Sequence, residues 1–182
     1  RQPFDDYLAQ KDEWEVLIDV DTLSAKEGKS WVWKGAQVCP EDHSLALVTL
    51  SEGGSDANET REFNIEERAW VQGGFFRPAA KGGLTWLDAN WCWLSQPTPG
   101  ATSPSGYPLQ VRLWKRGEPM EEAAVILAGA PEDMIASAAV IRDRSGRCSV
   151  LAVAKDIFTA ERYLVTGPAE ELTAHSPSLI RV

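Results

Sequence analysis

Turn-forming residues interrupt this sequence so often that long helices are excluded. Glycine pairs stand at 53–54, 73–74 and 82–83, and the segment QPTPGATSPSGYP at 96–108 adds a loop rich in proline, serine and glycine. Glycine and proline are the strongest breaks in secondary structure, and the apolar runs between these breaks are short. The pattern therefore predicts a series of short strands.

The predicted strands are rich in β-branched and aromatic residues, and the eight tryptophans lie mostly in or beside them, which favours sheet packing. One stretch differs: Pro119–Ala128, PMEEAAVILA, has the propensity of a helix that follows a proline, and we predict a helix there. The strands are predicted at Trp14–Asp19, Trp31–Val38, Leu45–Leu50, Thr60–Ile65, Leu84–Leu87, Trp91–Leu94, Leu109–Lys115, Ile135–Ile141, Ser149–Ala154 and Glu161–Val165.

A weak internal repeat groups these strands. An apolar strand, a polar turn and a strand bearing Glu, Thr or Arg recur in this order, beginning near Leu45, Trp91 and Val150, and each group follows another strand. The spacing is close to the roughly 40 to 50 residues of a four-stranded propeller blade. We therefore predict an all-β fold, a partial β-propeller of about three blades of four antiparallel strands, as one domain over 1–182 with blades at approximately 31–80, 84–130 and 134–182.

Several short motifs follow one another in a fixed order: Gly53-Gly54-Ser55-Asp56-Ala57, Arg61-Glu62-Phe63, Gly73-Gly74-Phe75, Ala80-Lys81-Gly82, Ser105-Gly106-Tyr107-Pro108 and Leu113-Trp114-Lys115-Arg116-Gly117. None identifies a family alone. Together, over nearly the whole chain, they resemble the N-terminal β-propeller of bacterial members of the prolyl oligopeptidase family (S9A serine peptidases).

The resemblance implies a function for a larger protein. In that family the propeller caps an α/β-hydrolase domain, screens peptides by size, and encloses a Ser-Asp-His triad that cleaves short peptides after proline. We therefore expect a non-catalytic segment that gates peptide access and docks on a hydrolase domain of the same parent chain, which is absent here. The alternative is a stand-alone propeller-type module that binds a protein partner. Further blades and a hydrolase motif encoded after Val182 would favour the first, and a stop codon the second.

A third hypothesis is that the chain is itself a serine hydrolase with Ser55 as its nucleophile. Its surroundings match the first three positions of the family's nucleophile motif, Gly-Gly-Ser-Asn-Gly-Gly. A nucleophile elbow needs a helix directly after the serine, but residues 59–65 alternate like a strand. We predict that Ser55 is a turn residue of a hairpin, with positive φ at Gly53 and Gly54 and with Asp56 capping backbone N–H groups. No catalytic residue is predicted in the chain.

The sequence also predicts no cofactor and no metal. Its two histidines, His43 and His175, lie far apart, and Asp19–Asp21 begins like a calcium loop whose later ligands are missing. An odd number of widely spaced cysteines fits neither a disulfide framework nor a zinc site. We predict buried free thiols for Cys39, Cys92 and Cys148.

Two groups of residues have competing interpretations. The basic residues on predicted strands either line the propeller channel and attract peptide carboxylates or solvate the outer face, and the second is favoured. The segment around Tyr107-Pro108 either faces the hydrolase domain or is a long surface loop, and the loop is favoured. The basic residues are Arg61, Arg112, Lys115, Arg116 and Arg162.

Charge limits the partners. A net charge of -9 and a pI near 4.8 argue against nucleic acid and anionic membranes, and no run of eighteen apolar residues is present. The free cysteines and the missing signal peptide favour the cytoplasm. Because the sequence lacks an initiator Met, we predict that it starts inside a longer gene product, which leaves the periplasm open.

An arc of three blades leaves two blade faces uncovered, since each blade buries its faces against neighbours. We therefore expect the isolated chain to associate with itself. A monodisperse monomer in light scattering, together with a cooperative melt, would contradict this expectation.

Overall fold

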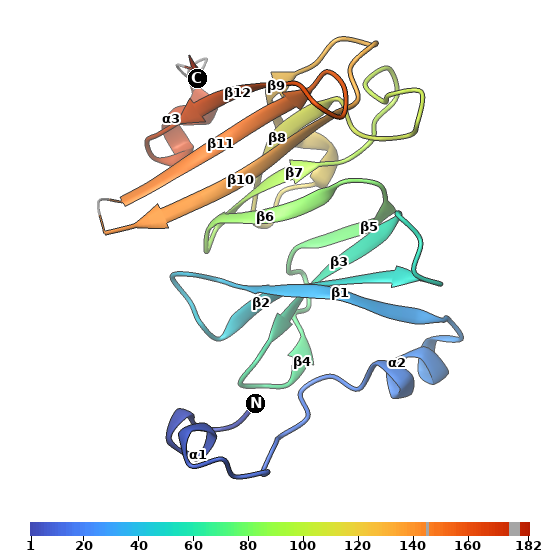
Figure 1. The fold of residues 1–182 in the computed structure, drawn as a ribbon, viewed down its shortest axis with the longest axis vertical. Helices are drawn as coiled ribbons and strands as arrows, with labels where there is room; N and C mark the ends of the chain where they lie inside the picture. The colour runs from blue at the N-terminus through green and yellow to red at the C-terminus, as the bar shows by residue number, and fades with distance from the viewer. Residues whose placement is uncertain (145, 175–178) are drawn as a thin grey trace.

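The computed structural model describes residues 1–144, 146–174 and 179–182. Within these residues the chain forms three antiparallel sheets, which we call blades 1, 2 and 3. They follow one another in sequence and in space, with blade 1 low and blade 3 high in the view of Figure 1. The predicted all-β, partial propeller fold is confirmed.

Each blade begins with its innermost strand, and the following strands pair outward in antiparallel order. Blade 1 has the order β1 (Trp31–Val38), β2 (Leu45–Glu52), β3 (Asn58–Asn64) and β4 (Ala69–Trp70), and β5 (Phe76–Ala80) also pairs with β3. Blade 2 has the order β6 (Gly83–Asp88), β7 (Trp91–Ser95), β8 (Gln110–Lys115) and β9 (Ala124–Ala128). Blade 3 has the order β10 (Ile135–Asp143), β11 (Gly146–Ala154), β12 (Ala160–Val165) and β13 (Ile180–Arg181).

The helices are short and lie outside the sheets: α1 (Phe4–Leu8), α2 (Val20–Glu27) and α3 (Ala169–Ala174). The predicted strand Trp14–Asp19 is wrong, because this segment runs irregularly into α2. Asp19, once considered as the start of a calcium loop, caps that helix by accepting a hydrogen bond from the Thr22 N–H at 2.9 Å.

The predicted helix Pro119–Ala128 is also wrong. Only Met120–Glu122 forms a single 3-10 turn, and the rest is strand β9, which pairs with β8. Pairing with a buried neighbour outweighs the helix propensity of alanine, leucine and glutamate here, because propensity is a weak preference.

Two cores join the blades. Between blades 1 and 2, the Phe75 ring packs edge-on against Trp86 and Trp114, with ring centroids 5.6 and 4.9 Å apart. Between blades 2 and 3, Trp91 and Trp93 pack on small and aliphatic residues of blade 3 and α3. Most tryptophans thus serve sheet packing as predicted, but Trp14 and Trp33 are exposed. The buried free thiols are confirmed for Cys39 and Cys92, whereas Cys148 is only partly buried.

Candidate functional site at the inner strand edges

The innermost strands β1, β6 and β10 are each the edge of their sheet, and they converge on one cleft. We call it the inner-strand cleft. It has a volume of about 320 Å³ and is bounded by all three blades. Its lining residues are Lys34, Asp56, Asn58, Gly82, Gly83, Thr85, Trp93, Ser95, Tyr107 and residues 135–138.

The loop at 96–108 closes one side of this cleft. The Tyr107 hydroxyl lies 3.2 Å from Asp56 Oδ2 of the β2–β3 turn, and Lys81 Nζ lies 4.4 Å from the centre of the Tyr107 ring. The Pro108 carbonyl accepts a hydrogen bond from the Ala136 N–H at 2.7 Å. The loop is therefore a bridge between three blades, which goes beyond the favoured interpretation of a surface loop.

A buried arginine, Arg77, lies beside the cleft between blades 1 and 2. Arg77 donates to the backbone oxygen of Asn58 at 2.8 Å, to its Oδ1, and to Gln96 Oε1 at 2.8 Å. Burial lowers the pKa of Arg77 to about 10, because no carboxylate among the described residues bonds to it and its Nε has no partner there. This side chain fixes the start of β3 against blade 2.

A second set of contacts fixes blade 3 against blade 2. The Trp93 indole N–H donates to Ser149 Oγ at 2.8 Å in a buried setting. Arg142 and Arg147, directly opposite each other on β10 and β11, both donate to the Leu87 carbonyl, at 2.6 and 2.7 Å. These contacts hold the three inner strands in a fixed relation around the cleft.

Ser55 lies in the exposed turn between β2 and β3, as predicted for a hairpin. Gly53 and Gly54 have φ of 62° and 78°. The predicted cap by Asp56 is wrong, since its carboxylate contacts Tyr107 and, at 3.7 Å, Lys81 instead. The next residues form strand β3 rather than a helix, and Ser55 Oγ donates to the Ala57 carbonyl at 3.1 Å.

In the described residues neither histidine is seen near Ser55, where a catalytic serine would need a general base. His43 is exposed in the β1–β2 loop, at the end of β2 opposite the Ser55 turn. His175 falls outside the described residues. Within the described ranges no cluster of three or more His, Cys, Asp or Glu is arranged to hold a metal ion.

The five basic residues considered for the channel lie elsewhere. Arg61 bonds to Glu27 of α2, and Arg116 bonds to Glu62 between blades 1 and 2. Arg112 donates to the backbone of Glu121, Lys115 lies over the Trp91 ring, and Arg162 is exposed on β12. None of them lines the cleft.

The basic residue that does line the cleft is Lys34, which sequence analysis missed. Its only signal was a charged position between Trp33 and Gly35 in a mostly apolar strand. The ladder between β1 and β2 shifts register there, so no simple alternation could place this side chain.

The comparisons with known proteins decide the family. The family model described as prolyl oligopeptidase, N-terminal beta-propeller domain, matches residues 1–175. The chain belongs to this family. It is 36% identical over 148 residues to an uncharacterized peptidase of Sinorhizobium fredii, covering 81% of this chain and 20% of that protein. It is 29% identical over 173 residues to an uncharacterized peptidase of Rickettsia prowazekii, covering 88% of this chain and 24% of that protein.

Solved structures agree with the fold. A post-proline cleaving enzyme from Rickettsia typhi matches with a TM-score of 0.85 and 26% identity over 98% of this chain and 27% of that enzyme. Oligopeptidase B from Leishmania major matches with a TM-score of 0.63 at 18% identity, which supports the fold alone. The chain thus spans about a fifth to a quarter of the length of these peptidases. In the described residues, every helix is too short or too polar to cross a bilayer.

Proposed function

We propose that this chain is the non-catalytic propeller segment of a prolyl oligopeptidase-like serine peptidase. In this role it limits which peptides reach a hydrolase domain outside the chain and forms part of the surface on which that domain docks. The observation that carries the proposal is the pair of coverages for the Rickettsia typhi enzyme: 98% of this chain aligns, but only 27% of the enzyme. The exposed turn around Ser55 supports the non-catalytic part.

The first test is chemical. The purified chain is treated with a fluorophosphonate probe and its mass is measured, with Ser55→Ala as control. We expect no adduct. An adduct that disappears in the Ser55→Ala variant would mean that the chain is itself a hydrolase.

The second test asks whether the gene encodes a hydrolase domain after Val182. Reading the codons after Val182 separates a peptidase, with further blades and a Gly-x-Ser-x-Gly motif, from a stand-alone module with a stop codon.

In a full-length peptidase, cleavage of a short fluorogenic Gly-Pro peptide is compared with cleavage of an unfolded protein. Glu62→Gln, which weakens the bond between blades 1 and 2, should raise the rate on the long substrate relative to the short one. An unchanged ratio would contradict a filtering role for these blades.

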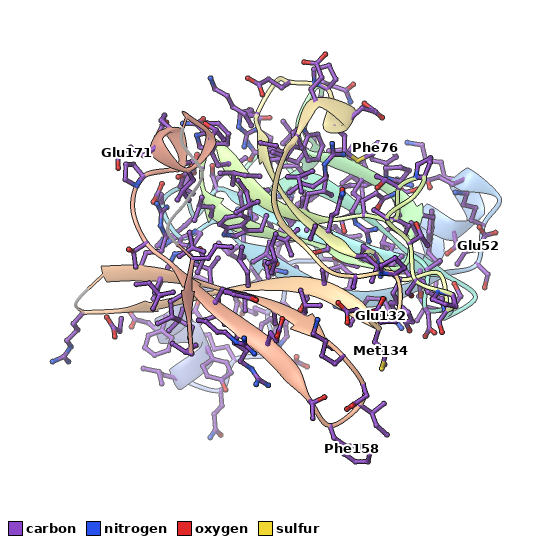
Figure 2. All side chains as sticks on the ribbon, turned by 90° about the horizontal axis from the view of Figure 1, so that it is seen from above. Glu52, Phe76, Glu132, Met134, Phe158 and Glu171 are labelled. Atoms are coloured by element: carbon purple, nitrogen blue, oxygen red, sulfur yellow. The ribbon has the colours of Figure 1, made fainter. Side chains whose placement is uncertain are left out.

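One observation favours the second candidate, a module that binds a protein partner. The β11–β12 hairpin exposes Ile157 (75%) and Phe158 (89%), and Figure 2 shows Phe158 at its tip, projecting away from the rest of the chain. Asp156 Oδ1 fixes this tip by accepting the N–H groups of Phe158 and Thr159 at 2.7 and 2.8 Å. Neighbouring exposed apolar residues of this kind occur in contact surfaces. Loss of partner capture in Phe158→Ser, in a gene product without a hydrolase domain, would support this candidate.

A further inference from the structure

The backbone of β10 has one paired edge and one edge that is largely open. Among the described strands, β10 pairs with β11 alone. The Ala136 N–H points the other way, because it donates to Pro108 outside the sheet. Backbone groups of every second residue in a strand share one direction, so those of Ala138 and Val140 also point away from β11. In the part of the chain that the structure describes, these two residues have no hydrogen-bond partner on this edge.

The neighbouring inner edge is closed by side chains. On β6, the Leu84 carbonyl accepts a hydrogen bond from Gln37 Nε2 at 3.3 Å, and the Trp86 carbonyl accepts one from Arg142 Nη2 at 3.2 Å. Side-chain caps of this kind protect an edge strand from pairing with another chain. Of these two edges, β10 is the one whose backbone groups are accessible beside the cleft.

The cleft allows a backbone to approach that edge. The residues of β6, β10 and the preceding turn that line it include Gly82, Gly83, Ala136, Ser137 and Ala138, all with small side chains. Its volume of about 320 Å³ lies at the lower end of the range of ligand pockets, roughly 300 to 1,000 Å³, which is enough for a few residues of extended chain.

We propose that the open edge of β10, at Ala138 and Val140, binds an extended peptide as an added strand. The idea that peptides reach this place rests on the proposed function. Main-chain hydrogen bonds supply the affinity in such strand addition, so the side chains of the peptide matter little. Lys34 and Asp56 give the cleft both charges and no preference for either sign. A proline is rejected wherever its missing N–H would face β10.

The test uses two peptides. A fluorescein-labelled heptapeptide of Ser, Thr and Val is titrated with the purified chain and followed by anisotropy. Its twin carries N-methyl groups on two consecutive central amides, so that either edge of the peptide is blocked. We expect the twin to bind about tenfold more weakly or worse, as the loss of one to two hydrogen bonds implies, and a scrambled sequence to bind within about threefold. Equal binding of both peptides, or no binding of either, overturns the proposal.

A pair of variants locates the site. Ala138→Pro removes the outward N–H without removing a bond to β11, which an edge strand tolerates. Ala138→Ser keeps the N–H and is the matched control. We expect the proline variant to bind the unmodified peptide about tenfold more weakly and the serine variant to bind it normally, with melting curves checked for both. If the proline variant does not fold, the methylated peptide still decides.

Two other outcomes are distinguishable. Dimers in light scattering that Ala138→Pro converts to monomers would show that a second copy occupies the edge, which overturns the peptide proposal. A stop codon after Val182 would overturn the proposed peptidase role without affecting measured peptide binding. A full-length peptidase with a size filter but no effect of N-methylation would retain its role and overturn only the edge proposal.

Discussion

The fully buried carboxylate of Glu62 in blade 1 is bonded at both oxygens by Arg116 of blade 2. Arg116 Nη1 lies 2.9 Å from Oε2 and Nη2 lies 2.8 Å from Oε1. Glu62 Oε2 also accepts the Phe75 N–H at 2.8 Å, and Arg116 Nη2 donates to the Ala89 carbonyl at 2.9 Å. The pair is therefore a fully bonded junction between neighbouring blades, at positions 54 residues apart.

Removing either partner should destabilise the chain unequally. Arg116→Leu leaves a buried carboxylate without its cation, and we expect a loss of about 3 kcal/mol in the free energy of unfolding. Glu62→Gln leaves Arg116, which is 27% exposed, in contact with water, so we expect about 2 kcal/mol. Urea denaturation of both single variants and the double variant measures the coupling. Additive losses would show that the two side chains do not stabilise each other.

Two adjacent glycines at the cleft should differ in how far alanine destabilises the chain. A Cβ at Gly82 would lie 2.1 Å from the backbone oxygen of Ser95, and its φ is +123°. A Cβ at Gly83 meets nothing within 4 Å. We expect Gly82→Ala to lose about 3 kcal/mol or more and Gly83→Ala to change stability by less than about 1 kcal/mol. Similar melting temperatures for the two variants would contradict the packing described at Ser95.

The strands that could be predicted from the sequence are those whose pattern lies within a short segment of the chain. The strands that became β2, β3, β10 and β11 were predicted as short runs between turn residues, and the β2–β3 hairpin was predicted from Gly53 and Gly54 at its turn. β9 was missed because AVILA has helix propensity and becomes a strand only by pairing with β8. The short β4 and β5 gave too few residues for a pattern.

The site was less predictable, because its contacts join distant positions. The bond between Tyr107 and Asp56 joins residues 51 apart, and that between Arg142 and Trp86 joins residues 56 apart. The sequence pattern places basic residues on strands, but the packing of the blades determines which of them forms an ion pair with a carboxylate. Arg116 was therefore given the wrong environment, and Lys34 was not considered.

The pairing of Glu27 with Arg61 predicts a loss of stability in acid. Hydrogen bonding from Arg61 lowers the pKa of Glu27 to about 2 from its ordinary 4.5, so the folded state favours the charged carboxylate. The resulting stability is present above about pH 4.5 and is lost as the pH falls toward 2. The Glu27 side chain is 25% exposed and partly screened by solvent, so we expect this pair to contribute about 2 kcal/mol or less to the free energy of unfolding. Unfolding free energies of the wild type and Glu27→Gln should converge in this window; a constant difference would contradict the assigned pKa.

Two buried serines form a matched pair for the last prediction. Ser149 Oγ accepts the Trp93 indole N–H at 2.8 Å, whereas Ser51 Oγ has no hydrogen-bond partner in the described residues. Ser149→Ala leaves a buried N–H without an acceptor, and we expect a loss of about 1 to 3 kcal/mol. Ser51→Ala removes a buried hydroxyl that makes no bond, and we expect no loss or a small gain. Chemical denaturation of both variants checks this. A larger loss in Ser51→Ala than in Ser149→Ala would mean that the bond between blades 2 and 3 is not what Ser149 contributes.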